Sequence, residues 1–246
     1  MPVRSRRFLI FPTVLLFLVV AVPLVAQPAP VRVAIVGLEH DHVQGFLGAF
    51  PHQHDAQLVG IVDATAALRA KYERQFHLDP SLFYDSLDDL LAHRHPQALL
   101  VYTSIAEHRP IIEAAAAHHL DVMVEKPLTL SLADAQRVER EVQAGNVRGC
   151  VCFEARFSSQ MLATKSVIDA GLLGTLHYGE VDYFHGIGPW SRQFRWNTRR
   201  DAGGSSLLSA GCHALDALLM CMGSDVRSVV SRSTRSRSES FAPYEY

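Results

Sequence analysis

The sequence lacks an excess of charge of either sign, and it is poor in cysteine. Against 23 Lys and Arg residues stand 25 Asp and Glu, so the formal net charge is −2 over 246 residues. The basic residues are scattered rather than grouped in a stripe, so the sequence does not indicate a basic surface that binds nucleic acid. The cysteines are Cys150, Cys152, Cys212 and Cys221. Cys150 and Cys152 alternate along one expected strand and are poorly placed to bridge each other, so we expect buried free thiols.

A long apolar run occurs at the N-terminus, from Phe8 to Ala26. Arginines precede it and a Pro-rich spacer follows it, which is the pattern of an export signal. We therefore predict that residues 1–30 are a signal peptide with its spacer, and that the protein is exported to the periplasm or secreted. The alternative is an uncleaved membrane anchor, because the run is just long enough to span a bilayer. The segment 5–9 is close to a twin-arginine signal, whereas the apolar run favours the Sec route, so both routes stay open.

Beyond residue 30, short apolar runs alternate with segments of helical composition. The runs VRVAIVG, QLVGIVD, ALLVYTS and DVMVEKP have the content and length of buried parallel strands. Over residues 31–148 this alternation predicts an α/β domain, a Rossmann-type doubly wound parallel sheet with right-handed crossovers. Its ligand crevice is expected at the carboxyl ends of the strands. That rim carries Gly37, Asp63, Thr103, Ser104, Glu125 and Lys126.

Residues 149–246 show a different pattern, in which strands and helices no longer alternate regularly. We expect strands at 149–157, 175–184 and 226–235, and helices at 158–171 and 207–223. This order predicts an α+β domain with an open, incomplete antiparallel sheet, because the final strand has no partner after it. An unfinished sheet leaves a free edge through which homo-oligomers can form.

The first strand leads into Gly37-Leu38-Glu39-His40-Asp41-His42. A dinucleotide-binding turn normally reads G-x-G-x-x-G, so that the backbone can approach a pyrophosphate. Glu39 and His42 stand at the second and third glycine positions, so this turn alone predicts nucleotide binding only weakly. The H-x-H pair, with His52 and His54 nearby, offers no third ligand, and we predict no metal site.

Asp63 ends the second strand, where an acid binds the ribose 2′-hydroxyl of NAD. The alternative role is to cap the helix that follows, which an Asp does equally well. No Arg follows Asp63 directly, Arg69 being the nearest one. The residues therefore favour NAD over NADP.

Three further motifs occur in a fixed order: Thr103-Ser104-Ile105-Ala106-Glu107-His108, then Glu125-Lys126-Pro127, then the segment from Gly203 to Asp216. They resemble the T-P-x-x-x-H, E-K-P and G-G-G-x-L-x-D-x-G-x-H-x-x-D motifs of the Gfo/Idh/MocA family, which includes glucose–fructose oxidoreductase and inositol dehydrogenase. The resemblance implies an NAD(P)-dependent oxidoreductase that transfers hydride between the cofactor and a sugar, cyclitol or related hydroxyl. It also implies the cofactor contacts Gly37, Leu38, Asp63, Thr103, Ser104, His108, Glu125 and Lys126.

The resemblance assigns two catalytic residues. Lys126 matches the lysine that polarises or deprotonates the reacting hydroxyl, and His213 matches the histidine that takes the hydroxyl proton. The Lys126–Pro127 bond is often cis in the family. Four residues before His213 the family has an Asp, whereas this chain has Ser209, which cannot supply a charge to stabilise an imidazolium. Asp216 lies three residues after His213, near the same helical face, and is a candidate substitute.

Arg156, Trp190 and Asp216 are candidate contacts for a sugar or polyol substrate, since guanidinium donors and aromatic faces suit such molecules. Family members usually continue well beyond this point, so the chain resembles a C-terminally truncated member. Two alternatives stay open on the same fold. One is a catalytically silent carbohydrate-binding protein, favoured by the departures from the family motifs, and the other is a truncated, inactive fragment.

Overall fold

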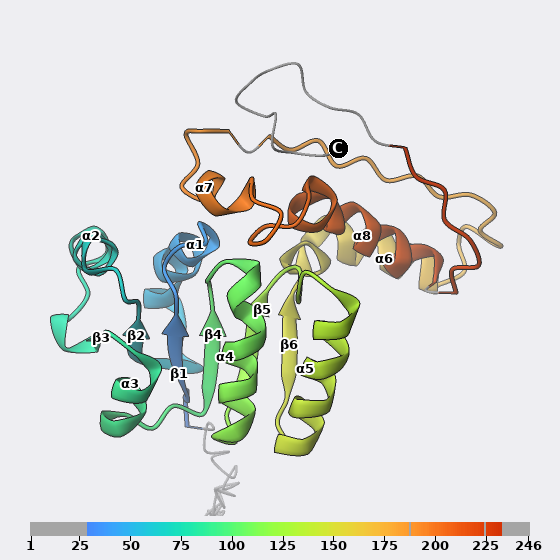
Figure 1. The fold of residues 1–246 in the computed structure, drawn as a ribbon. Coiled ribbons are helices and arrows are strands. Elements are labelled where there is room, and N and C mark those ends of the chain that lie inside the picture. Colours follow the sequence, from blue (N-terminus) through green and yellow to red (C-terminus); the bar gives the residue numbers. More distant parts are fainter. Residues whose placement is uncertain (1–28, 187, 224, 233–246) are drawn as a thin grey trace, which may run out of the picture.

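The computed structural model describes residues 29–186, 188–223 and 225–232 (Figure 1). Its centre is a six-stranded sheet in the order β3-β2-β1-β4-β5-β6, and all neighbouring strands are parallel. The strands are β1 (Val31–Val36), β2 (Ala56–Val62), β3 (Phe83–Tyr84), β4 (Ala98–Val101), β5 (Asp121–Glu125) and β6 (Gly149–Cys152). The strand order reverses between β1 and β4, where ligands bind in such sheets. The predicted doubly wound parallel sheet is confirmed.

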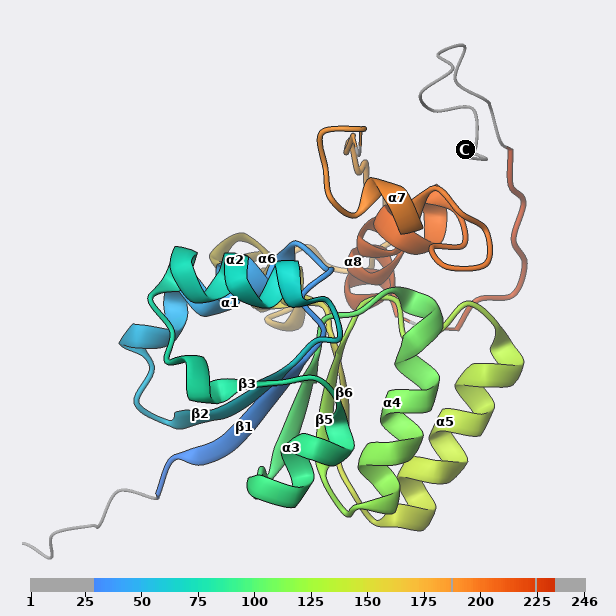
Figure 2. The same cartoon turned by 60° about the vertical axis from the view of Figure 1, so that its left-hand side comes forward.

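Helices cover both faces of the sheet and bury one apolar cluster on each. They are α1 (His42–Ala49), α2 (Ala66–Phe76), α3 (Leu87–His93), α4 (Ile105–Ala117) and α5 (Leu132–Gly145). Because side chains of a strand alternate between faces, Val33 and Ile35 of β1 join the cluster under α1 and α2. Ala34 and Val36 join the cluster under α3, α4 and α5. Figure 2 shows α1 and α2 on one side of the sheet and α4 and α5 on the other.

The start of α4 is fixed by a capping box. Ser104 and Glu107 form a reciprocal capping box at the start of α4, which satisfies backbone donors that a helix start leaves unpaired. The helix therefore starts at Ile105, and Pro110 lies inside it.

The first sheet extends past the expected domain boundary at residue 148. β6 pairs in parallel with β5, with Val122 opposite Gly149 and Glu125 opposite Cys152. Val151 of β6 packs against the same apolar cluster as α4 and α5. Residues 149–152 thus complete the parallel sheet instead of beginning the second domain.

The rest of the described chain is helical or irregular. Its elements are a 3₁₀ turn (Glu154–Phe157), α6 (Ser159–Asp169), α7 (Phe194–Asn197), a π-helical turn (Leu207–Gly211) and α8 (Cys212–Met222). Two further 3₁₀ turns occur earlier in the chain, at Phe50–His52 and Pro80–Leu82. In Figure 1, α6, α7 and α8 lie above the carboxyl ends of the strands.

The antiparallel sheet predicted for the second domain is wrong for the part of the chain that the structure describes. Residues 175–186 and 225–232 form no strand there, and positions 233–235 of the last expected strand lie outside the described residues. A strand persists only where a neighbour pairs with its backbone N–H and C=O groups, and beyond β6 the described segments include no such neighbour.

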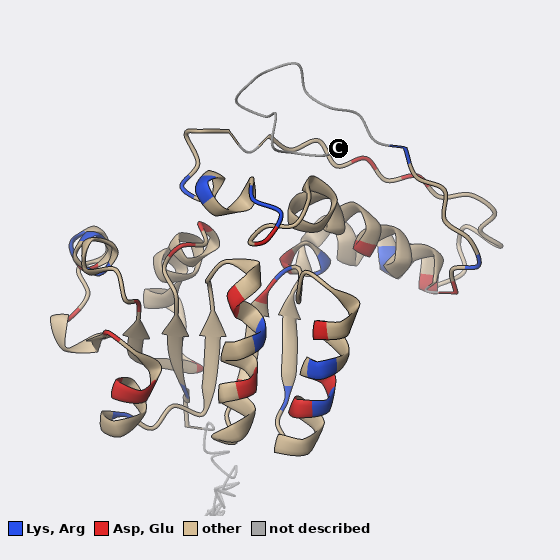
Figure 3. Cartoon of the chain, in the orientation of Figure 1, with Lys and Arg blue, Asp and Glu red and all other residues tan. Residues whose placement is uncertain are grey.

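Three surface properties complete the fold. Among the described residues, no helix is both long and apolar enough to cross a membrane; the predicted signal peptide up to residue 28 lies outside them. The four cysteines are free thiols, as predicted, but they are not buried: Cys150 is exposed and the other three are half-buried. Figure 3 shows acidic and basic residues interleaved along α5, so this surface has no charge of a single sign.

Candidate active site

The turn after β1 packs tightly against the end of β4. Gly37 has a φ of +88°, in the left-handed region that favours glycine. A Cβ at this position would lie 2.3 Å from Cγ2 of Thr103. The backbone N–H of His40 donates to the carbonyl of Tyr102 at 3.0 Å. The first glycine of the degenerate motif is therefore required by the backbone, and it lies beside Thr103 on the rim.

Asp63 joins the turns after β1 and β2. Its Oδ2 accepts the backbone N–H of Leu38 at 2.8 Å, and its Oδ1 accepts that of Thr65 at 2.8 Å. Both Asp63 and Leu38 are buried. The carboxylate thus organises the loops themselves, although its remaining lone pairs can still accept a ribose hydroxyl. Arg69 is engaged by Asp85, with 2.6 Å between Nη2 and Oδ1.

The first amides of α1 are already hydrogen-bonded within the turn. The N–H of His42 donates to Nδ1 of His40 at 3.3 Å, and the N–H of Val43 donates to the His40 carbonyl at 3.2 Å. The N–H of Gln44 donates to the carbonyl of Asp41 at 3.1 Å. A helix N-terminus binds an anion through free N–H groups. In this turn these three amides are already occupied.

A cavity of about 670 Å³ opens beside this turn. One side carries Leu38, Glu39, Thr65, Ala67 and Leu68, and the other carries Pro189, Trp190, Ser191, Arg192, Phe194, Arg195, Trp196 and Arg199. Arg192 links the two sides, because its Nη2 donates to Oδ1 of Asp41 at 2.9 Å and to the hydroxyl of Tyr72 at 2.6 Å. Figure 3 shows basic residues on and around α7. The cavity thus has an arginine-rich wall.

The E-K-P turn at the end of β5 is hydrogen-bonded to a histidine of α4. The Lys126–Pro127 peptide is cis, as the resemblance implies. His108 is fully buried, and its Nδ1–H donates to the carbonyls of Pro127 and Leu128 at 3.1 and 3.2 Å. Burial lowers the pKa of His108. This histidine, predicted to contact the cofactor, positions the E-K-P turn through its backbone.

Lys126 and His213 lie close together, near enough for the charge of Lys126 to act on the imidazole. Both side chains are buried, each with 6% of its surface exposed. The Nζ of Lys126 donates to the backbone carbonyl of Ser209 at 3.1 Å, one helical turn before His213. Burial lowers the pKa of His213, and the charge of Lys126 lowers it further. The structure brings together the two predicted catalytic residues.

The carboxylate nearest to His213 comes from Glu154, which the sequence analysis does not single out. Its Oε1 lies 3.7 Å from Nε2 of His213, and its charge raises the pKa of the imidazole against the effect of burial. The Oγ of Ser209 and the Nδ1 of His213 are buried without a hydrogen-bond partner among the described residues. Ser209 therefore does not orient His213 through its hydroxyl.

The three predicted substrate contacts fall in two places. Arg156 and Asp216 form an ion pair, with 2.7 Å between Nε and Oδ2. Asp216 is thereby engaged away from His213 and does not replace the missing Asp of the motif. Trp190 lines the arginine-rich cavity, of which Arg156 and Asp216 are not lining residues, and it is largely exposed.

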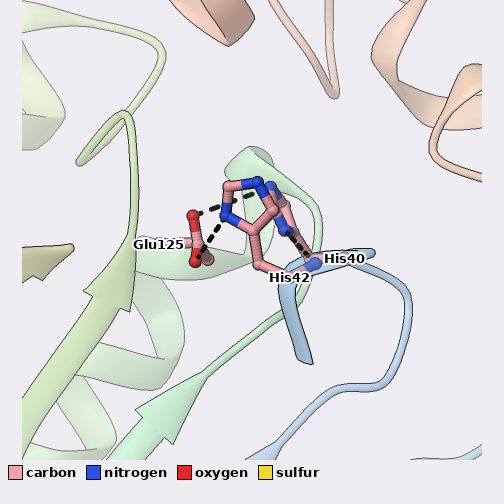
Figure 4. A group of neighbouring side chains, drawn as sticks. All are labelled: His40, His42 and Glu125. Carbon is pink, nitrogen blue, oxygen red and sulfur yellow. Dashed lines mark hydrogen bonds and ion pairs between the residues drawn. The ribbon is translucent and has the colours of Figure 1, made fainter. Parts of the chain in front are cut away.

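Two histidines of the β1 turn meet the E-K-P glutamate (Figure 4). The Nδ1 of His42 lies 3.1 Å from Oε1 of Glu125, and the Nε2 of His40 lies 3.8 Å from its Oε2. His40 and Glu125 are 2% and 1% exposed, whereas His42 is 38% exposed. Burial holds the pKa of His40 well below its usual range. Imidazole nitrogens and a carboxylate oxygen form a donor set that suits divalent transition metals.

Both parts of the chain match known family models. Residues 31–153 match the model described as "Oxidoreductase family, NAD-binding Rossmann fold", and residues 161–245 match the "GFO/IDH/MocA C-terminal domain". Inositol 2-dehydrogenase 1 of Saccharopolyspora erythraea is 27% identical over 229 residues, which cover 86% of this chain and 60% of that protein. D-apiose dehydrogenase of Rhizobium rhizogenes is 27% identical over 137 residues, covering 55% and 38%. The chain spans less than two thirds of the length of either relative.

Solved structures share the fold. The aldose–aldose oxidoreductase of Caulobacter crescentus, complexed with glycerol, superposes with a TM-score of 0.76 at 22% identity, covering 88% of this chain and 65% of that one. An inositol dehydrogenase homologue of Azotobacter vinelandii, complexed with NAD+, superposes with a TM-score of 0.68 at 24% identity, covering 78% and 54%.

Proposed function

Since this chain belongs to the GFO/IDH/MocA oxidoreductase family, with that family's NAD-binding Rossmann fold, we propose that it is an exported enzyme that transfers hydride between NAD and a hydroxyl-bearing carbon of a sugar or cyclitol. One observation carries the proposal. The ammonium of Lys126 is anchored 3.1 Å from the carbonyl of Ser209, so a buried cation lies close to the buried imidazole of His213. These are the groups that proton transfer from an alcohol requires.

His213 is suited to take the hydroxyl proton. Its pKa is lowered by burial and by the charge of Lys126, so the neutral, proton-accepting imidazole is the main form near neutral pH. Glu154, at 3.7 Å, stabilises the imidazolium that forms when the proton arrives. The negative partner that the family motif places one turn before the histidine is thus supplied from a different element.

Lys126 is suited to stabilise the substrate oxygen. An ammonium has three donors, and the Ser209 carbonyl accepts one of them. The remaining N–H groups can donate to the oxygen on which negative charge develops as its proton leaves. The bound nicotinamide supplies the acceptor for the hydride from the adjoining carbon.

The residues of the arginine-rich cavity fit a dinucleotide, although its phosphate groups would contact arginine side chains rather than the first amides of a helix. Because the first amides of α1 are occupied, the positive charge for phosphate groups comes from Arg195 on the opposite wall, since Arg199 is paired with Asp201. Asp63 keeps acceptor positions for a ribose hydroxyl. Arg69 is bound by Asp85, which supports NAD over NADP.

The relatives support the substrate class. Two curated relatives are dehydrogenases of inositol and of D-apiose, and one solved relative is an oxidoreductase of aldoses. All of these molecules are small and rich in hydroxyl groups. We expect the same class here, with Arg156 and Trp190 as candidate contacts.

The test of this function has two steps. NADH is titrated into the purified protein and its fluorescence is followed, and NAD reduction is then measured with a panel of cyclitols and aldoses. Saturable NADH binding and turnover of at least one polyol are expected. The absence of saturable NADH binding would exclude the dehydrogenase.

A second function is supported by the occupied amides of α1. If these prevent dinucleotide binding, the chain is a silent carbohydrate-binding protein of the same fold. Calorimetric titration with the same polyols separates the two functions, because the silent protein binds a polyol but neither binds NADH nor turns it over.

The proposal of export rests on the sequence of residues 1–30. Intact-mass measurement of the protein recovered from the periplasm or the culture medium tests it directly. A mass corresponding to cleavage after Ala26 is expected, whereas recovery of the full-length chain from the membrane fraction would favour the uncleaved anchor.

A further inference from the structure

We propose that His40, His42 and Glu125 form a binding site for one divalent transition-metal ion, of which Zn²⁺ is the representative. Figure 4 shows the two imidazoles and the carboxylate pointing toward one another. Two histidines and one carboxylate form a known ligand set for catalytic zinc, with further positions left open. The site goes beyond the proposed hydride transfer.

The spacing of the donor atoms suits a single ion. One donor atom from each of the three residues lies within 4.8 Å of the other two. Two ligands about 2.1 Å from a tetrahedral ion lie roughly 3.4 Å apart. The Nδ1 of His42 lies 3.1 Å from Oε1 of Glu125 and the Nε2 of His40 lies 3.8 Å from its Oε2, so each imidazole faces one carboxylate oxygen at a separation near this value. Small side-chain rotations therefore bring all three donors to one ion.

The charge balance also favours a cation at this place. Glu125 is 1% exposed, and a buried carboxylate is costly unless a positive charge or several hydrogen bonds compensate it. Within the described part of the chain, no Lys or Arg side chain forms an ion pair with Glu125. The backbone N–H of Lys126 donates to its Oε2 at 3.2 Å, and its other close partners are the two imidazoles.

Each imidazole can keep its proton on the ring nitrogen that does not bind the metal. His42 can carry its proton on Nε2, because this side chain is 38% exposed and reaches solvent. The Nδ1 of His40 accepts the His42 backbone N–H at 3.3 Å. Metal binding at its Nε2 therefore moves the proton to Nδ1 and gives up this long hydrogen bond.

The position of Glu125 gives the H-x-H pair of the sequence a third ligand. The H-x-H pair in the β1 turn lacks a third ligand along the chain, and Glu125 supplies it from the end of β5. His42 stands where a dinucleotide-binding turn has its third glycine, so the residue that departs from the motif is one of the proposed ligands.

The experiment measures Zn²⁺ binding by calorimetry on the full chain, after metal is stripped with a chelator and without any nicotinamide present. One Zn²⁺ per chain is expected. His42→Ala and Glu125→Gln are expected to lower the affinity by at least the roughly 10–100-fold that loss of an outer-shell partner costs. His54→Ala, from the exposed pair His52-x-His54, is the matched control and should change nothing.

Two results would overturn the site: no stoichiometric Zn²⁺ binding by the wild type, or the same affinity in His42→Ala as in His54→Ala. Circular dichroism establishes that each variant is folded, and His42→Gly serves as the second variant because it restores the glycine of the usual turn.

Cobalt(II) absorption on the wild type gives an independent readout, with intense visible bands expected for nitrogen and oxygen ligands in tetrahedral geometry. NADH binding by the metal-free protein is measured separately, so failure of the metal site is distinguishable from failure of the dehydrogenase.

Discussion

The carboxylate of Glu154 lies 3.7 Å from Nε2 of His213 and raises the pKa of an imidazole that burial and Lys126 lower. Glu154 comes from the turn directly after β6, far in sequence from the helix that carries His213. The negative charge that a buried imidazolium needs is thus available, although Ser209 occupies the position where the motif has an Asp.

Replacing Glu154 by Gln is expected to shift the pH dependence of kcat/KM. His213 acts as a base in its neutral form, so activity rises as the pH passes upward through its pKa. Removal of the nearby negative charge lowers that pKa, and the rising limb moves to lower pH. The maximal rate should fall because the imidazolium loses its counter-charge. Glu139→Gln, on the exposed face of α5, is the control, and an unshifted limb in Glu154→Gln would contradict the assigned role.

Arg195→Ala is expected to weaken NADH binding. Arg195 is exposed on the wall of the 670 Å³ cavity, and a hydrogen bond to a charged group is worth about 1.5–3 kcal/mol. Loss of roughly tenfold in affinity is expected, and the difference should shrink at high salt because the interaction is screened. Fluorescence titration measures both effects. Arg140→Ala, on α5 away from the cavity, should bind like the wild type, and equal affinity in the two variants would argue against phosphate binding here.

Gly37→Ala is expected to destabilise the fold by about 1–3 kcal/mol, since it forces a strained backbone conformation. The added Cβ would also lie 2.3 Å from Cγ2 of Thr103. Gly45→Ala is the control: this glycine lies on α1 with nothing within 4 Å of its built Cβ, so the change should stabilise by about 0.5–1 kcal/mol. Urea unfolding of both variants measures the difference, and equal free energies of unfolding would contradict the packing of the turn.

The sequence predicts the elements of this fold better than the contacts of the site. Four strands, from VRVAIVG to DVMVEKP, are recognised because buried parallel strands are continuous apolar runs. The position of GCVC was less clear, because it lies where the regular alternation ends, and only pairing with β5 assigns it to the first sheet. Had that strand been placed correctly, Glu154 would have appeared on the rim directly after it. The strands expected at 175–184 and 226–235 depend on neighbours that a local pattern does not reveal.

Roles of single residues were hardest to predict where a residue has two plausible partners. The resemblance assigns His108 to the cofactor, whereas in the structure its buried ring bonds the backbone of the E-K-P turn. Asp216 lies on the helix of His213, yet Arg156 binds it. In both cases the deciding partner is distant in sequence, so spacing along one helix could not identify it.

Lys126 and His213 are proposed to act on the same substrate hydroxyl, and a double-mutant cycle on NAD reduction decides whether they do. Lys126→Met and His213→Asn should each lower kcat by roughly 10²–10⁴-fold, the usual contribution of general acid–base groups. Because the two groups would act as a unit, the double variant should be scarcely slower than either single variant. Loss in the double variant equal to the product of the two single losses would show that they act independently, and would contradict the account.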